Sequence, residues 1–285
     1  MTNPVVDIKK LWTVFKNGDK EVVIHKDLDL TVQRGEILSL VGGSGTGKTV
    51  LLRQMLGLEH PTKGEITVLG QPVSDARSMA LHESQSLSFE MQLGSHAGFV
   101  QQLAPLVARA FGNQPAFEPA NLHRLMTRVK PGLIRVDADE VTYPAHVILR
   151  YEIERPLVEG EIEAEDIPAL WDAKMQELLG LDTRGNFTDG PLQDVHWPEA
   201  LFGYFPCYSL GAMYAAQWFA AMRRAMPDLD ARIGQGDLTA VFDWLRDNIW
   251  SQASRWTTDE LALRASGETL NPAHFKAHLL ARYVG

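Results

Sequence analysis

The chain has only one cysteine, Cys207, among 285 residues, so an internal disulfide is excluded. No positively charged segment followed by an apolar one opens the sequence, as a secretory leader would. Because disulfides are rare in reducing compartments and leaders direct export, both absences favour a cytoplasmic setting. We therefore expect a cytoplasmic protein.

An excess of basic residues is also missing. Lys and Arg number 27 against 36 Asp and Glu, which gives a formal net charge of −9 and disfavours nucleic acid as a partner. The charge is uneven, since residues 1–70 hold 9 basic and 8 acidic side chains and the negative excess lies beyond them. Six of the seven tryptophans also lie beyond residue 70. This shift in composition predicts a domain boundary near residue 70.

Long apolar runs are scarce, and one uncharged segment, residues 201–222, needs comment because its length alone would span a bilayer. Gly203, Pro206, Gly211 and Gln217 interrupt it, and its aromatic residues are spread along it rather than gathered at two interfaces. We therefore predict a loop followed by a buried helix, and no transmembrane segment.

The first seventy residues alternate short β-type runs with a helical pattern. Runs typical of strands occupy residues 5–8, 22–24, 28–32, 37–41 and 66–69, and apolar residues recur at helical spacing over residues 50–58. The order of strand, loop, helix and strand predicts a short α/β fragment over residues 1–70. It is too short to be a complete domain of that class.

A phosphate-binding loop joins the fourth of these strands to the helix. Residues 42–49 fit the pattern G-x-x-x-x-G-K-[ST], in which the glycines Gly42, Gly45 and Gly47 let backbone N–H groups surround phosphate oxygens. Lys48 adds a charge for the β and γ phosphates, and Thr49 offers a hydroxyl to Mg²⁺. These residues predict binding of ATP and Mg²⁺ by the N-terminal fragment.

The flanking segments "VVDIKKLW" and "IHKDLDLTVQRGEILSLVGGSGTGKTVLLRQMLGLEHPTKGEITVLG" resemble the start of ABC transporter ATPases. The resemblance implies that Phe15 stacks on the adenine ring. It also implies a glutamine loop, an LSGGQ-like signature, a strand ending in Asp-Glu and a switch histidine, and none of them follows. Asp243 imitates the Asp-ending strand but lacks the glutamate and lies in a helical pattern. We therefore expect no ATP hydrolysis.

Beyond Gln71 the pattern changes to long helices with clear boundaries. Thr257 and Glu260 form a capping box, and Asn271 with Pro272 is typical of a helix start. The sequence therefore predicts a mainly α second domain over residues 71–285, preceded by the incomplete α/β phosphate-loop fragment.

Three segments of this second part, "GQPVSDARSMALHESQSLSFEMQLG", "KPGLIRVDADEVTYPAHVILRYEIERPLVEGEI" and "GPLQDVHW…FGYFPCYSLGAMYAAQ", resemble the carboxypeptidase Taq family of zinc metallocarboxypeptidases. The motif HESQ is intact at residues 82–85, and IRxxAD is intact at residues 134–139. The resemblance covers about the C-terminal half of a family member. It implies an enzyme that removes residues from peptide C-termini, and a homodimer.

Roles for four residues follow from this resemblance. Glu83 would be a ligand of the catalytic zinc, and Arg135 would bind the terminal carboxylate of the peptide substrate. His196 and Tyr204 would steady the charge that develops on the scissile carbonyl. Without the resemblance, Glu83 is more commonly a solvated helix carboxylate, and Arg135 a surface ion-pair partner.

The departure from the family is the absence of HExxH, which supplies the other two zinc ligands and the general base. None of the nine histidines begins such a motif, and the corresponding upstream sequence is ABC-like. His274 and His278 have the right spacing on a predicted helix, but Phe275 stands where the catalytic glutamate belongs. An ordinary amphipathic helix is the simpler interpretation of that pair.

Three functions therefore stay open at this stage. The chain is a carboxypeptidase fragment that is inactive alone, or active only when another chain donates HExxH. Alternatively it is a nucleotide-binding fragment of a transporter ATPase. The third hypothesis is a chimera of two families without a selected function.

Overall fold

The computed structural model describes residues 4–17, 20–36, 38, 40–41, 46–55, 61–68, 71–72, 78–252 and 255–284. The chain divides into two compact units, one of residues 1–77 with 246–261 and one of residues 78–245 with 262–285. Each unit is described by itself below.

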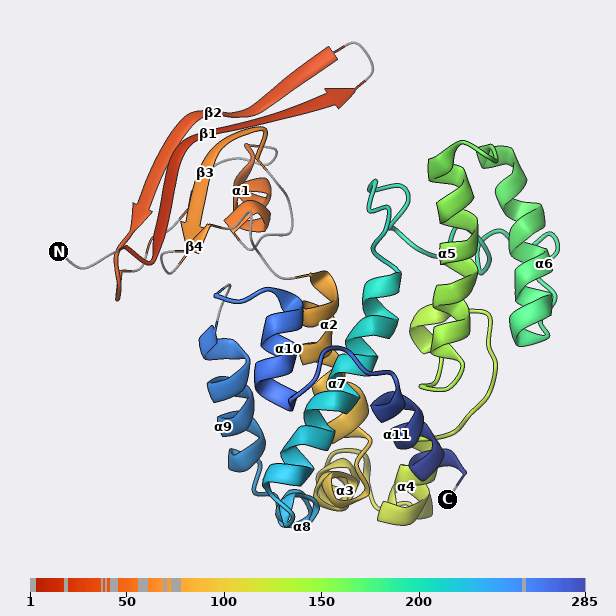
Figure 1. The fold of residues 1–285 in the computed structure, drawn as a ribbon. Helices are drawn as coiled ribbons and strands as arrows, with labels where there is room; N and C mark the ends of the chain where they lie inside the picture. Colours follow the sequence, from red (N-terminus) through yellow and green to blue (C-terminus); the bar gives the residue numbers. More distant parts are fainter. Residues whose placement is uncertain are drawn as a thin grey trace. The chain divides into compact units, whose positions relative to one another are not determined.

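The first unit is built on an antiparallel sheet. Its strands are β1 (Val6–Asn17), β2 (Lys20–Val32), β3 (Lys63–Val68) and the two-residue β4 (Gln71–Pro72), in the spatial order β2-β1-β3-β4 (Figure 1). Helix α1 (Lys48–Met55) packs on this sheet through Leu51. The core of the unit consists of buried apolar side chains from β1, β3 and α1, namely Ile8, Leu11, Leu51 and Ile66.

The second unit is helical, and two helices that contribute mainly to it, α9 and α10, extend across the division between the units. Its helices are α2 (Met79–Leu87), α3 (Ala97–Phe111), α4 (Pro119–Met126), α5 (Tyr143–Glu159), α6 (Ile167–Leu179), α7 (Pro206–Ala225), α8 (Leu229–Gly234), α9 (Thr239–Asn248), α10 (Thr258–Ser266) and α11 (Ala273–Tyr283). A π-helical segment, Ser88–Gly94, continues α2. Short 3-10 turns lie at Pro115–Phe117, Arg135–Asp137 and Ala164–Asp166, while a further one at Trp250–Gln252 belongs to the first unit.

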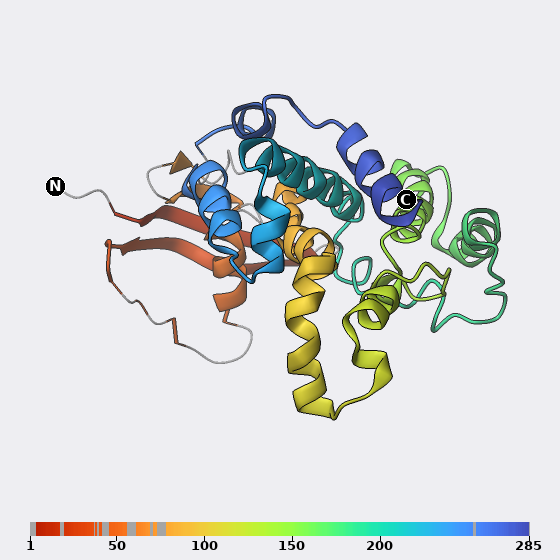
Figure 2. The same cartoon turned by 90° about the horizontal axis from the view of Figure 1, so that it is seen from below.

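Helix α7 is the centre of this unit. It packs against α2, α5, α8 and α11, and the rotated view shows α7 between α2 and α11 (Figures 1 and 2). Trp218 and Phe219 of α7 are fully buried, as are Ala215 and Met222. A second apolar cluster lies between α5 and α6 around Leu149, Ile153, Trp171 and Met175. Helix α5 therefore belongs to this cluster and also packs against α7.

Several expectations from the sequence are confirmed. The chain is mainly helical, and residues 206–225 form a buried helix that follows a loop. In the capping box, the Glu260 backbone N–H donates to Thr257 Oγ1, and the Thr257 backbone N–H donates to Glu260 Oε2. Among the helices of the described ranges, none combines the length and apolarity that crossing a membrane requires.

Two details differ from the sequence expectations. Helix α11 begins at Ala273, one residue later than predicted, and Asn271 Oδ1 accepts from the Ala273 N–H. The strand predicted over residues 37–41 is not present at Leu38, Leu40 or Val41, while residues 37 and 39 lie outside the described ranges. Leu40 instead contributes its side chain to the core of the first unit.

Candidate functional site

The HESQ motif lies on α2, where its serine anchors the helix. Ser84 is fully buried, its hydroxyl donates to Leu81 O, and it accepts hydrogen bonds from Trp218 Nε1 of α7 and from Gln85 Nε2. The α2 face that carries Ser84 is therefore fixed against α7. Glu83, the neighbouring residue, is half-buried beside the start of α7.

Gly211 of α7 makes this close approach possible. A Cβ atom added at Gly211 would lie 2.7 Å from Glu83 Cβ and 3.0 Å from Ser84 N. Since real Cβ atoms do not approach other atoms within 3.0 Å, only glycine fits between the two helices here. The contact places Glu83 against the first turns of α7.

Tyr204, just before α7, donates a hydrogen bond from its hydroxyl to Glu83 Oε1 at 2.6 Å. Ser86 Oγ donates to the other carboxylate oxygen at 3.2 Å. Burial raises the pKa of Tyr204 well above its usual value, and the hydrogen bond to Glu83 raises it further. Tyr204 therefore stays protonated at neutral pH and acts as a donor.

Arg135 lies in the 3-10 turn Arg135–Asp137, and only 7% of its side chain is exposed. Its Nε and Nη2 donate to Asp194 Oδ1 at 2.9 and 2.7 Å, and its Nη1 donates to the Tyr143 hydroxyl at 2.5 Å. A guanidinium has about five N–H donors. Three nitrogens of Arg135 are thus oriented by the protein, while one N–H on each terminal nitrogen has no hydrogen-bond acceptor among the described residues.

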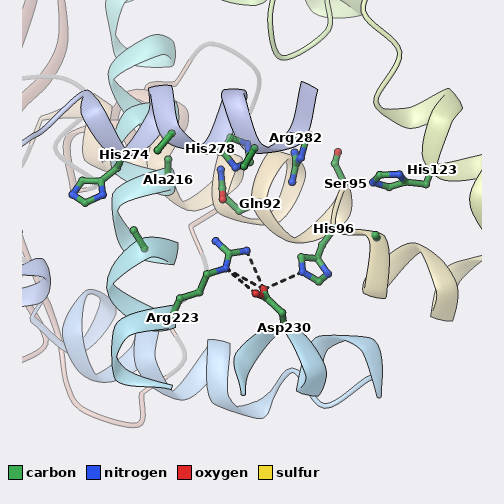
Figure 3. Close-up of a pocket in the computed structure, with 14 residues that line it drawn as sticks. Gln92, Ser95, His96, His123, Ala216, Arg223, Asp230, His274, His278 and Arg282 are labelled. Atoms are coloured by element: carbon green, nitrogen blue, oxygen red, sulfur yellow. Dashed lines mark hydrogen bonds and ion pairs between the residues drawn. The ribbon is translucent and has the colours of Figure 1, made fainter. Parts of the chain in front are cut away.

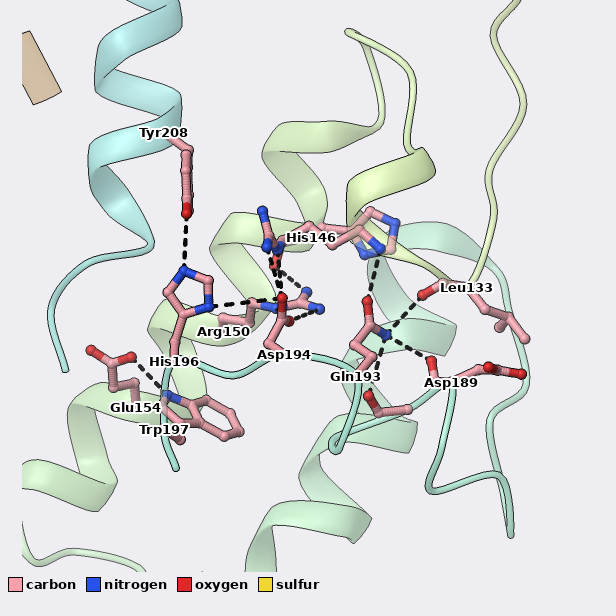
Figure 4. A network of polar contacts seen from close by, with 12 residues as sticks. Leu133, His146, Arg150, Glu154, Asp189, Gln193, Asp194, His196, Trp197 and Tyr208 are labelled. Carbon is pink, nitrogen blue, oxygen red and sulfur yellow. Dashed lines mark hydrogen bonds and ion pairs between the residues drawn. The ribbon is translucent and has the colours of Figure 1, made fainter. Parts of the chain in front are cut away.

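A second arginine, Arg150 of α5, lies beside Asp194 (Figure 4), and its side chain is fully buried. Its Nε donates to Asp194 Oδ2 at 2.6 Å, and its guanidinium lies 4.6 Å from the centre of the Trp171 ring. Burial lowers the pKa of Arg150 to about 10, so it remains charged at neutral pH. Burial alone would raise the pKa of Asp194, but the two arginines lower it, and Asp194 stays ionised.

His196 links the arginine cluster to Tyr204. Its Nε2 lies 2.9 Å from the Tyr208 hydroxyl, and its Nδ1 lies 3.9 Å from Asp194 Oδ1 (Figure 4). The Tyr208 ring is 5.3 Å from the Tyr204 ring, centre to centre, and 4.9 Å from the Arg135 guanidinium. Burial and the charge of Arg135 lower the pKa of His196, which favours the neutral imidazole.

The fold therefore gathers Glu83, Arg135, His196 and Tyr204, which are up to 121 residues apart in sequence, into one site. The sequence analysis did not single out the residues that hold them, namely Tyr143, Arg150, Gln193, Asp194 and Tyr208. A signal existed for two of these, because Gln193 and Asp194 lie in the segment "GPLQDVHW" directly before His196. The interpretation of Arg135 as a surface ion-pair partner is wrong, since the side chain is buried.

The residues of the predicted phosphate loop lie in the first unit. Gly42 and Gly45 fall outside the described residues. Gly47 has a φ of 87°, and an added Cβ would lie 2.6 Å from Ile24 Cγ2. Lys48 and Thr49 form the first turn of α1 directly after it, and Lys48 Nζ donates to Thr46 Oγ1 at 3.3 Å.

Phe15, the predicted adenine-stacking residue, lies on β1 opposite Val22, and 42% of it is exposed. The stacking role stays a prediction.

A complete zinc site does not fit the residues that the structure describes, because no group of three His, Cys, Asp or Glu side chains among them could hold a metal ion. Glu83 is a single carboxylate already bound by Tyr204. His274 and His278 face different carboxylates, each at 2.6 Å: His274 contacts Glu268, and His278 contacts Glu140. A catalytic zinc requires about three protein ligands, so the residues that the structure describes supply too few.

A cavity of about 550 Å³ lies elsewhere in the helical unit, between α3, α7, α8 and α11 (Figure 3). Its walls include Ala216 and Ala277, together with Arg223, which forms an ion pair with Asp230. His96 contacts the same carboxylate at 3.1 Å. None of the four predicted residues of the peptidase site lines this cavity.

Comparison with known proteins connects the site to a family. The family model for carboxypeptidase Taq (M32) metallopeptidases matches residues 59–283. The chain belongs to this family. The thermostable carboxypeptidase 1 of Thermus thermophilus is 38% identical over 215 residues, which cover 75% of this chain and 42% of that protein.

A solved structure gives the same result for the fold of the M32 region. Metallocarboxypeptidase 1 of Trypanosoma cruzi superposes with a TM-score of 0.71 at 52% sequence identity, covering 74% of this chain and 44% of that one. The chain thus spans less than half the length of the M32 proteins it matches. The lipoprotein-releasing system ATP-binding protein LolD of Alcanivorax borkumensis is a further relative, 31% identical over 137 residues, which cover 46% of this chain.

Proposed function

We propose that the M32 region of this chain is the substrate-binding half of a metallocarboxypeptidase site and does not hydrolyse peptides alone. One observation carries the proposal: Arg135 is held rigidly by Asp194 and Tyr143 with N–H donors left over. A planar guanidinium of this kind suits bidentate binding of a carboxylate. The C-terminal carboxylate of a peptide is the ligand that a carboxypeptidase must recognise.

The polar groups beside Arg135 suit the scissile carbonyl, which precedes the terminal residue of the peptide. The Tyr204 ring, the His196 imidazole and the Arg135 guanidinium all contact Tyr208. Donors in such positions stabilise negative charge on a carbonyl oxygen. In this structure the Tyr204 hydroxyl donates its hydrogen bond to Glu83. To donate to a substrate carbonyl instead, Tyr204 must release Glu83.

Hydrolysis is not expected of the chain by itself. Glu83 is the one family metal ligand within it, and the sequence contains no HExxH motif for the remaining ligands and the general base. An isolated carboxylate binds zinc weakly, because affinity depends on the whole ligand set. Activity would require a second chain that contributes HExxH.

The direct test is an assay of the purified chain with added zinc and a blocked dipeptide that has a free C-terminus. We expect no turnover above background, and clear turnover would overturn the claim of an incomplete site. The upstream half of an M32 protein is then added as a second polypeptide. We expect the mixture to hydrolyse the dipeptide, and Glu83→Gln to abolish this activity. A mixture that forms a complex but stays inactive would refute complementation.

Nucleotide binding by the N-terminal unit is a second candidate function. It is supported by the order Gly47, Lys48, Thr49 at the start of α1 and by the similarity to LolD. The chain lacks the acidic pair that ATP hydrolysis needs, so the proposal is binding of ATP and Mg²⁺ without turnover. Failure of both functions would favour the third hypothesis, a chimera without a selected function.

A further inference from the structure

We infer that Arg150, which no ligand can touch, sets the preference of this site for a free carboxylate by keeping the cluster of Arg135, Asp194 and Arg150 positively charged. The inference deepens the proposed function and rests on it. Arg150 is a positioning residue rather than a catalytic one, because its side chain is fully buried.

The charges of the three side chains do not cancel. Asp194 binds Arg135 through Oδ1 at 2.7 Å and Arg150 through Oδ2 at 2.6 Å, so one carboxylate is shared by two guanidinium groups. An Arg135–Asp194 pair alone would be neutral and would attract an anion only weakly. Arg150 restores a net positive charge at a place where water does not screen it.

The aromatic surroundings support this assignment. The Arg135 guanidinium lies 5.6 Å from the Phe205 ring centre and 4.9 Å from the Tyr208 ring centre. Arg150 lies 5.4 Å from the same Phe205 ring and 4.6 Å from Trp171. Neither side chain has a further carboxylate among its contacts in the described residues, since Asp194 is the acid that both share. A buried cluster with an excess cation is stabilised when an anion binds at its open side, and that side is Arg135.

The nearby imidazoles do not supply the positive charge. Burial and the charge of Arg150 lower the pKa of His146 to about 4, and burial and the charge of Arg135 lower that of His196. Both rings are therefore neutral at pH 7. Among these side chains, the two arginines therefore carry the positive charge that attracts a carboxylate.

The test compares an acetylated dipeptide with its C-terminal amide, each titrated into the full chain by ligand-observed NMR, which detects weak binding. For wild type we expect the acid to bind about tenfold more tightly than the amide. In Arg150→Met we expect this preference to fall about tenfold. In Arg150→Lys, which keeps a charge, it should stay within about twofold of wild type.

A matched control is Arg155→Met, five residues further along α5, where the arginine is 60% exposed and pairs with Glu159. It should leave the preference unchanged. A merely structural role for Arg150 would weaken the acid and the amide equally and leave their ratio intact, which would overturn the inference. Equal binding of acid and amide by wild type would instead overturn the proposed function, and this inference with it.

If Arg150→Met does not fold, Arg150→Lys still allows the charged and uncharged states of this position to be compared in one folded protein. Raising the pH until the new ammonium loses its proton should remove the acid preference, while wild type retains it to higher pH. A preference that persists in Arg150→Lys after this deprotonation would contradict the inference.

Discussion

Gly211→Ala tests the contact between α2 and α7 that positions Glu83. The added Cβ would lie 2.7 Å from Glu83 Cβ, 3.0 Å from Glu83 C and 3.0 Å from Ser84 N. Two of these three atoms belong to the backbone of α2 and cannot move by a side-chain rotation. The two helices must therefore separate by several tenths of an ångström.

Two opposing effects decide the outcome. Alanine is favoured over glycine within a helix by about 1 kcal/mol. Overpacking of a close-packed interface costs about 1–3 kcal/mol, and the upper part of this range applies because the obstacle is backbone. We therefore expect Gly211→Ala to lower the free energy of unfolding by about 1–2 kcal/mol. Helix propensity alone would raise it.

The measurement is urea unfolding followed by the helical circular dichroism signal. Gly132→Ala is the matched control, because an added Cβ at Gly132 meets nothing within 4 Å. We expect that control to unfold within about 0.5 kcal/mol of wild type. A Gly211→Ala protein as stable as wild type, or more stable, would refute the close approach of α2 and α7.

Two further predictions concern a buried carboxylate and the phosphate loop. Glu140 accepts hydrogen bonds from His278, Arg282 and Tyr283; burial alone would raise its pKa, but these partners lower it below the usual 4.5. Its contribution to stability is therefore present above pH 4.5 and is lost as the pH falls through the lower folded-state pKa. In Glu140→Gln, urea unfolding at pH 7 should show a loss of about 3 kcal/mol, and the decline of stability in acid should be shallower; an unchanged acid profile would contradict this assignment. For the phosphate loop, Lys48→Ala should weaken Mg-ATP binding at least about tenfold in a calorimetric titration, and equal binding by both proteins would leave Lys48 without a role.

The sequence predicted the helices of the M32 region better than the strands before it. Apolar spacing and caps are local signals, so the buried helix after residue 205 and the Thr257 capping box could be predicted directly. The strands were underestimated because β1 contains a register shift after Ile8, where Lys10 has a φ of 52°. This irregularity interrupts the alternation of apolar residues, so one long strand had the pattern of a short one.

The four named residues of the site were predicted from family motifs, but their supports were not. Arg150 lies 44 residues from Asp194 in sequence, and no periodicity indicates that the two meet. An arginine in an amphipathic helix is usually solvated. Only the tertiary structure shows that this one is fully buried and shares Asp194 with Arg135.

The geometry also explains why a site can persist in a chain that spans less than half of its relatives' length. Each support of Arg135 and Tyr204 lies within the helical unit: Asp194 precedes α7, Arg150 and Tyr143 belong to α5, and Glu83 belongs to α2. These contacts join elements of the helical unit that pack on one another. The sequence contains no HExxH motif, to which the family resemblance assigns the other two metal ligands. We therefore propose that recognition of a carboxylate and hydrolysis of a peptide bond depend on different parts of an M32 protein.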